Sequence, residues 1–167
     1  MPQGLKQASS VVSIGFQVNE SAANTFTQGS VDLNLSPLDR EVFVVLAVNL
    51  DPFNPDLAAA DSQVATSLTT TSQTATVNLS NSNCMANAIT TIKADAARAV
   101  GLLTGALETP PATLEYIGII ATNDFFVQVT GTGNIAAKGV SGKLYGYRAI
   151  ASADIYAALV QSEVLSA

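Results

Sequence analysis

The sequence predicts a mainly β protein: a single jelly-roll-like antiparallel β-sandwich with one inserted amphipathic helix and a C-terminal helix. Short β-branched segments recur along the chain, turn residues separate them, and only two segments show helical spacing. Short strands between turn signals are typical of sandwiches and barrels. A helix-flanked antiparallel sheet is the alternative. At 167 residues, we expect a flexible arm over residues 1–9 and one domain over 10–167.

Residues 41–50 (EVFVVLAVNL) are the most informative segment. Eight of these ten residues are apolar, four of them are valines, and Pro37 and Pro52 bracket the run. A short β-branched run of this kind predicts a strand that is buried on both faces. It is too short to cross a bilayer as a helix, which takes about 20 apolar residues. We therefore expect residues 41–50 to form the central strand of the core.

Two strands are predicted before this central strand. Apolar and polar residues alternate over 10–18, and again within 25–35. Because only a short turn separates the second segment from the central strand, we expect a hairpin that pairs 30–35 with 41–50.

The next segment, 51–61 (DPFNPDLAAAD), is an acidic loop. Its three carboxylates make a Ca²⁺ site the alternative to a solvated turn, although the spacing matches no EF-hand. Residues 63–79 are rich in Thr and Ser, and we expect two strands there, joined near 71–73.

Residues 85–103 have helical spacing. Their apolar residues recur at steps of three and four, Asn81, Ser82 and Asn83 offer N-caps, and Gly101 or Gly105 offers an end. The stripe that predicts this inserted helix is Met85, Ile89, Ile92, Ala96, Val100 and Leu103.

The C-terminal part predicts three strands and a helix. A turn at Asn123-Asp124 lets 125–130 pair back on 113–122, and a glycine turn at 131–134 precedes a strand over 140–149. On that strand we expect Lys143, Tyr145 and Tyr147 to share one face. Ser152 is placed to cap a helix over 153–165, whose apolar side is Ile155, Tyr156, Leu159, Val160 and Val164.

The charge balance excludes several function classes. Seven Lys and Arg against 13 Asp and Glu give a net charge of −6, and no two cations are adjacent, so we expect no strong direct nucleic-acid binding. Charged residues make up only 12% of the chain, about half the usual share. Much of the surface is therefore small and polar, or is covered by other chains. We expect neither a signal peptide nor a transmembrane segment.

We expect no enzyme, no cofactor and no metal. The chain has no histidine, so a serine nucleophile and the single Cys84 both lack the usual base. The carboxylate pairs that are close in sequence, Asp39 with Glu41 and Asp51 with Asp56, lie in predicted turns beside solvent. We expect Glu115 on the outward face of its strand. The Gly131-Thr132-Gly133 segment lacks the Lys and the helix of a phosphate-binding loop.

Two segments carry a family resemblance. The first is LDREVFVVLAVNLDP (38–52), and the second is 124–166, with DFFVQVTGTGN followed by KGVSGKLYGYRA and YAALVQSEVLS. In texture they resemble small virion proteins of uncultured marine and archaeal viruses. The resemblance implies a capsid (coat) subunit, located in the virion, that forms a β-rich homo-oligomeric shell with copies of itself and with other virion proteins. One departure is the N-terminal arm, which carries only Lys6 where genome-binding coat proteins carry a basic arm.

The rival function is an extracellular or cell-surface β-sandwich module that binds carbohydrate or protein, with Tyr145 and Tyr147 beside Lys143 stacking on a sugar ring. For the self-assembling protein, the candidate subunit interface consists of Tyr156, Val160, Tyr145 and Tyr147. The alternative for the C-terminal helix is that its apolar residues only cover the sheet of their own subunit.

Overall fold

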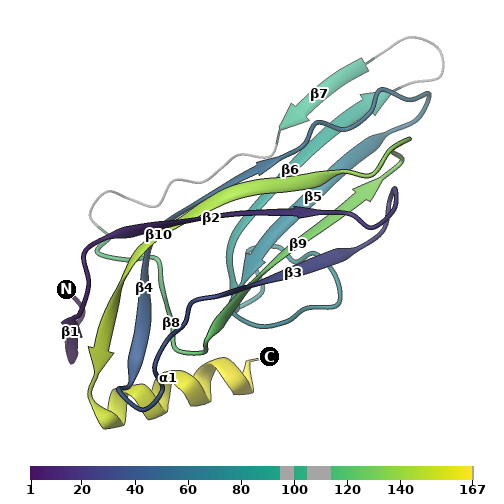
Figure 1. The fold of residues 1–167 in the computed structure, drawn as a ribbon. Coiled ribbons are helices and arrows are strands. Elements are labelled where there is room, and N and C mark those ends of the chain that lie inside the picture. The colour runs from purple at the N-terminus through teal and green to yellow at the C-terminus, as the bar shows by residue number, and fades with distance from the viewer. Residues whose placement is uncertain (95–99, 105–113, 167) are drawn as a thin grey trace.

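The computed structural model describes residues 1–94, 100–104 and 114–166, which form two facing antiparallel sheets and one helix (Figure 1). Sheet A has the order β1–β10–β4–β8, with β2 also pairing along β10. Sheet B has the order β3–β9–β5–β6–β7. In sheet A the strands are β1 (Leu5–Gln7), β2 (Val12–Asn19), β4 (Glu41–Pro52), β8 (Gly118–Ile120) and β10 (Gly139–Ala151). In sheet B they are β3 (Thr27–Asp32), β5 (Ser62–Thr69), β6 (Cys84–Ala94), β7 (Val100–Thr104) and β9 (Asp124–Thr132).

The strand pairing is that of a jelly roll. Four antiparallel pairs are nested in the sequence: β2 with β10, β3 with β9, β4 with β8, and β5 with β6. These pairs alternate between the two sheets, as in a long hairpin that has been rolled up into a sandwich. The predicted jelly-roll-like sandwich is therefore confirmed.

The main core lies between the two sheets. Phe43 and Val45 from sheet A meet Leu68 and Val127 from sheet B, and none of these side chains is more than 1% exposed. Ile14, Phe16 and Val18 close one side of this core from β2, as their alternation predicts. The Phe16 ring lies edge-on to Phe125, with 5.6 Å between the ring centroids.

The outer face of sheet A carries a second apolar cluster, covered by the helix α1 (Ala153–Leu165). Along β4, Val42 and Val44 face this cluster, whereas Phe43 and Val45 face the main core. Opposite Tyr145 and Gly146 of β10 the register of β4 skips Leu46, so that beyond this bulge even-numbered residues face the main core. Residues 42–45 are thus buried on both faces, because different layers cover the two sides of the strand. Beyond the bulge Ala47 and Asn49 are exposed, so the prediction of burial on both faces holds for only part of 41–50.

The inserted amphipathic helix predicted over residues 85–103 is wrong. Residues 84–94 form β6 and residues 100–104 form β7, which pair with each other, while 95–99 lie outside the described residues. Along β6, Ala88 and Thr90 are buried and face the core side in alternation, and Ile89-Thr90-Thr91-Ile92 is a β-branched run. Pairing of β6 with β5 over its whole length overrides the helical spacing.

Both predicted hairpins between neighbouring segments are also wrong. Residues 30–35 do not pair with 41–50, because β3 pairs with β9 and β4 pairs with β10 and β8. Residues 125–130 do not pair with 113–122, in which only β8 is a strand and residue 113 lies outside the described residues. In a jelly roll the chain crosses to the other sheet at these two turns, from β3 to β4 and from β8 to β9. Asn34 and Arg40, in the first of these connections, both have a positive φ.

The predicted strand over 63–70 is confirmed as β5, but the second one, over 74–79, is wrong. Those residues form an irregular segment against the outer face of sheet B, where Val77 N donates to Ser67 Oγ (3.2 Å) and Asn87 Nδ2 donates to Val77 O (2.8 Å). The hydroxyl and amide side chains make the hydrogen bonds to the Val77 backbone that a neighbouring strand would otherwise make. Ser67 is fully buried as a result.

The N-terminal segment meets the start of α1 at one end of sheet A, where Ser152 N donates to Gly4 O (3.2 Å). Within residues 1–9, predicted as a flexible arm, β1 pairs with the end of β10, and Leu5 is buried against the second cluster. The helix predicted over 153–165 is confirmed, with Ser152 at the N-cap position. No helix among the described residues is long and apolar enough to cross a membrane.

We expect Val44→Asp and Val45→Asp each to abolish soluble folded protein. Both side chains are 0% exposed, and an unpaired buried carboxylate costs several kcal/mol. Ala47→Asp on the same strand is the matched control, because Ala47 is exposed and its variant should fold. The measurement is soluble yield with circular dichroism. A stable Val44→Asp protein would show that α1 does not seal the outer face of sheet A.

Candidate functional site

The four residues of the predicted interface all lie at the outer face of sheet A. Tyr147 is 7% exposed inside the second cluster, and the half-buried Tyr156 and Val160 pack on that cluster from α1. Ile155 and Leu159 pack there too, so the helix uses four of its five predicted apolar residues within the subunit, whereas the fifth, Val164, is exposed. The structure thus brings together Tyr147, Tyr156 and Val160. A role for these residues between subunits remains a prediction.

Tyr145 is separate from that cluster. It lies on the side of the Leu46 bulge that α1 does not cover. In register it is paired with Ser13 of β2 and with Ala47 of β4. Lys143, two residues earlier on the same face, is exposed and is flanked by Gly15 and Asn49. A Cβ at Gly15 would meet no atom within 4 Å. The uncovered half of this face is therefore a shallow platform, with one aromatic ring among amide, hydroxyl and ammonium groups.

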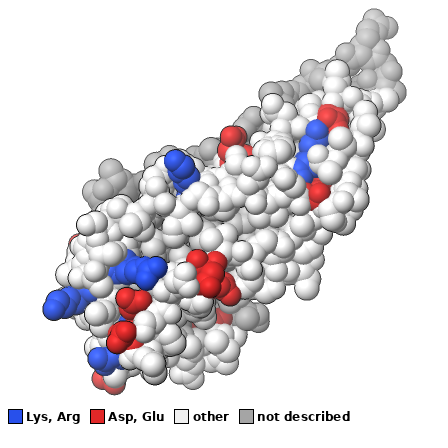
Figure 2. Space-filling model, in the orientation of Figure 1, with Lys and Arg blue, Asp and Glu red and all other residues white. Residues whose placement is uncertain are grey.

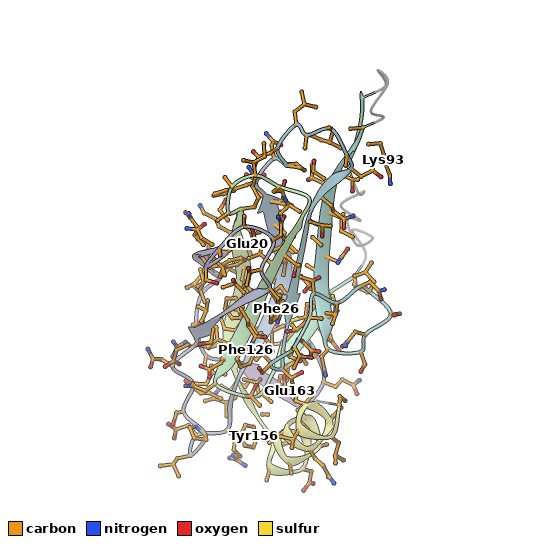
Figure 3. The ribbon with its side chains drawn as sticks, turned by 90° about the vertical axis from the view of Figure 1, so that its right-hand side faces the viewer. Glu20, Phe26, Lys93, Phe126, Tyr156 and Glu163 are labelled. Atoms are coloured by element: carbon orange, nitrogen blue, oxygen red, sulfur yellow. The ribbon has the colours of Figure 1, made fainter. Side chains whose placement is uncertain are left out.

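Glu163 is a buried carboxylate that our sequence-based argument missed. It is 8% exposed and faces the β8–β9 connection, where Ala121 N (3.1 Å) and Thr122 N (2.8 Å) donate to its Oε2. Burial raises its pKa, and the backbone donors oppose that shift. Figure 3 shows Glu163 and Tyr156 at the α1 end of the molecule. The spacing was a usable signal, because 163 continues the inward series 155, 156, 159 and 160.

Glu20 is a second missed buried carboxylate, at the opposite end of the sandwich from α1 (Figure 3). Its carboxylate accepts hydrogen bonds from Gly131 N (2.6 Å), Lys138 N (2.8 Å) and Thr25 N (3.0 Å). It therefore ties the β2–β3 connection to both ends of the β9–β10 connection. No local sequence signal identifies it, because two of these partners are more than a hundred positions away. Glu115, by contrast, is exposed, as predicted.

Asn134 joins the same loops. It is 6% exposed, and its side chain accepts from Asp56 N (2.9 Å) and donates to Gln63 O (2.9 Å). Its backbone O accepts from Asn24 Nδ2 (2.8 Å). Buried amides with several partners of this kind hold loops in one arrangement.

The acidic loop over 51–61 has its own ion pairs. Lys138 Nζ lies 2.5 Å from Asp56 Oδ1, and Lys93 Nζ lies 2.6 Å from Asp61 Oδ2. The hydrogen bond from each lysine, with backbone N–H donors, lowers the pKa of its aspartate. No group of three or more Cys, Asp or Glu side chains placed to hold a metal ion occurs among the described residues. These two carboxylates therefore serve loop contacts in this structure.

Cys84 begins β6 and is half-buried, with Sγ 3.3 Å from Ala86 O. Burial raises the pKa of its thiol, which opposes thiolate formation and hence nucleophilic reactivity.

Comparison of the chain with protein-family models, with curated proteins and with solved structures gives no match. The case for a function therefore depends on the geometry described above.

We expect Glu163→Gln to change how stability depends on pH. Burial raises the pKa of Glu163 above its ordinary value of 4.5, so the folded state binds the proton more tightly than the unfolded state does. The stability of the wild type relative to the variant should therefore be greatest below pH 4.5, and should fall as pH rises through the raised pKa. Urea unfolding of both proteins at several pH values measures this difference.

Glu163→Ala is the control, because it removes the acceptor for Ala121 and Thr122 and should destabilise the protein at every pH. A wild-type advantage over Glu163→Gln that grows with pH would contradict the assignment of Glu163 as a desolvated carboxylate.

Proposed function

We propose that this chain is a self-assembling structural protein, a coat (capsid) subunit that forms a homo-oligomeric shell in a virion. The observation that carries the proposal is the jelly-roll pairing of β2 with β10, β3 with β9, β4 with β8, and β5 with β6. This architecture occurs in viral capsid proteins, and also in lectins and cupins. Since one fold hosts several functions, the surface must discriminate among them.

The surface supports assembly because it is poor in charge. Figure 2 shows charged side chains as scattered spots and pairs on an otherwise uncharged face. Large apolar side chains are exposed at both ends of the sandwich: Leu57 (65%) and Ile135 (77%) at the loop end, and Val164 (60%) and Leu165 (75%) on α1. Contacts between copies would therefore consist of apolar and small polar groups, for which charge-poor surfaces are suited.

The outward face of α1 supports the same proposal. Its only charged residues are the exposed Asp154 and the inward Glu163, so the exposed positions between them are small or uncharged. The solvent face of an amphipathic helix normally carries charged residues, so a face with so little charge is suited to burial against another surface. The exposed positions of this face are Ala157, Ala158, Gln161, Ser162, Val164 and Leu165.

The N-terminal segment does not favour direct binding to nucleic acid. Residues 1–9 carry only Lys6, and β1 within them is paired with β10. The proposed shell therefore holds nucleic acid weakly, or through another layer of protein.

The test is the oligomeric state of the purified chain. We expect light scattering to give masses far above 17.1 kDa, and negative-stain electron microscopy to show closed particles of uniform size. The assembly should persist in molar salt, because exposed ion pairs contribute only about 0–1 kcal/mol each. A monomer at all concentrations would refute the proposal, and dissociation by salt alone would refute the apolar interface.

A second candidate function, a carbohydrate-binding module, is favoured by the platform around Tyr145. An aromatic ring flanked by small residues leaves its face accessible, and Lys143 and Asn49 lie close enough in register to bond sugar hydroxyls. Among jelly rolls, lectins use the same architecture.

If the platform binds sugar, Tyr145→Ala should abolish binding to a panel of neutral oligosaccharides, measured by titration calorimetry. Tyr145→Phe, which keeps the ring, should bind within a few-fold of wild type. Absence of any binding by the wild-type protein at millimolar sugar would eliminate this candidate.

A further inference from the structure

The outer edge of β2 is unpaired among the described strands. In sheet A this strand pairs with β10 alone. Glu20 N donates to Lys138 O (2.8 Å), one step beyond the last β2–β10 pair. This hydrogen bond shows which residues of β2 direct their N–H and C=O groups toward β10. Because antiparallel strands direct alternate residues to alternate sides, the even-numbered residues of β2 bond to β10. The N–H and C=O groups of Ser13, Gly15 and Gln17 therefore point away from the sheet.

This edge has none of the usual protection against strand pairing. Folded proteins place lysines, prolines or bulges on free edge strands to prevent association. From Gln7 to Asn19 there is no charged residue and no proline, and the β2–β10 register from residue 12 to residue 19 has no bulge. The core-facing residues Ile14, Phe16 and Val18 are only half-buried. A second strand along this edge would satisfy the free backbone groups and cover these apolar side chains further.

We propose that the partner on this edge is β2 of a second copy, paired antiparallel about a two-fold axis at Gly15 so that sheet A continues from one subunit into the next. The proposal rests on the self-assembly proposed above and names one of its interfaces. A two-fold axis places Ser13 of one copy opposite Gln17 of the other, which pairs their free N–H and C=O groups. Ile14 then faces Phe16 of the other copy, apolar against apolar.

The charge distribution selects a second copy as the partner. Each chain carries a net charge of −6, so two copies repel unless they meet where charge is absent. No residue of β2 itself is charged, and the charged side chain beside it in register is the exposed Lys143 of β10, opposite Gly15. The neighbouring edge strand β3, which β2 contacts where Val18 packs over Gly29, carries no charge before Asp32. In the paired sheet the two Lys143 residues are separated by both β2 strands, about three strand spacings of roughly 4.8 Å each. That separation exceeds the screening length of about 8 Å at physiological salt, so their repulsion is weak.

Amide hydrogen exchange measured by NMR tests the pairing on the unmodified protein. At a dilution where the chain is monomeric, the amides of Ile14, Phe16 and Val18 should be protected, and those of Ser13, Gly15 and Gln17 should exchange rapidly. At concentrations where it assembles, the second set should become at least tenfold slower. Rapid exchange of this set in the assembled protein would overturn the proposal.

Gln17→Pro tests the same edge by mutation. Proline removes the outward N–H without touching the even-numbered donors that bond to β10, and its ring blocks an approaching strand. Gln17→Thr is the matched control, because it loses the same side chain but keeps the N–H. By analytical ultracentrifugation the proline variant should need at least tenfold more protein to associate through this contact than the threonine variant does.

The outcomes separate this proposal from the proposed function. An assembly that forms equally well with Gln17→Pro would overturn the β2 interface and leave self-assembly intact. A wild-type chain that stays monomeric at every concentration would overturn both. Protection of Ser13, Gly15 and Gln17 that appears only when a different protein is added would replace the second copy with a heterologous partner and overturn the proposal.

Discussion

The fold depends on one constraint: β4 has to be covered on both faces. Val44 and Val45 are adjacent and both fully buried, so no single layer shields them. Sheet B covers the inner face, α1 covers the outer face, and the bulge at Leu46 ends the stretch that both layers cover. The remaining strands take their places around β4, with β10 on one side of it and β8 on the other.

The surface that the two covering layers leave exposed is poor in charge. Charged residues make up only 12% of the chain, and uncharged side chains occupy the exposed positions of β2 and most of those on α1. The charged groups serve local purposes, as in the Asp56–Lys138 and Asp61–Lys93 pairs of the loop end. The outer surface is therefore largely neutral backbone edge, small residues and isolated apolar side chains. The proposed association with copies of the same chain rests on that combination.

Much of the fold could be predicted from short-range pattern. The 41–50 run, the alternation of 12–18 and the helix over 153–165 needed only periodicity, and these elements formed where expected. The 85–103 helix failed because Ile89 and Ile92 fit both a helical stripe and a β-branched strand, and only distant pairing with β5 decides between them. Strand partners and the buried Glu20 were beyond prediction, because their contacts join residues far apart in the chain. Glu163 was within reach, since its position on the inward helical series was visible.

The most direct test of the account is native-state hydrogen exchange of the β4 amides in low denaturant. If sheet B and α1 cover opposite faces of one strand in a single cooperative structure, the amides of Phe43, Val44 and Val45 that bond to β8 and β10 exchange only by global unfolding. Their opening free energy then equals the global free energy of unfolding, and falls with denaturant at the same slope. Exchange through a smaller opening, well below global unfolding, would contradict the account, because it would show that a covering layer leaves β4 while the sandwich stays folded.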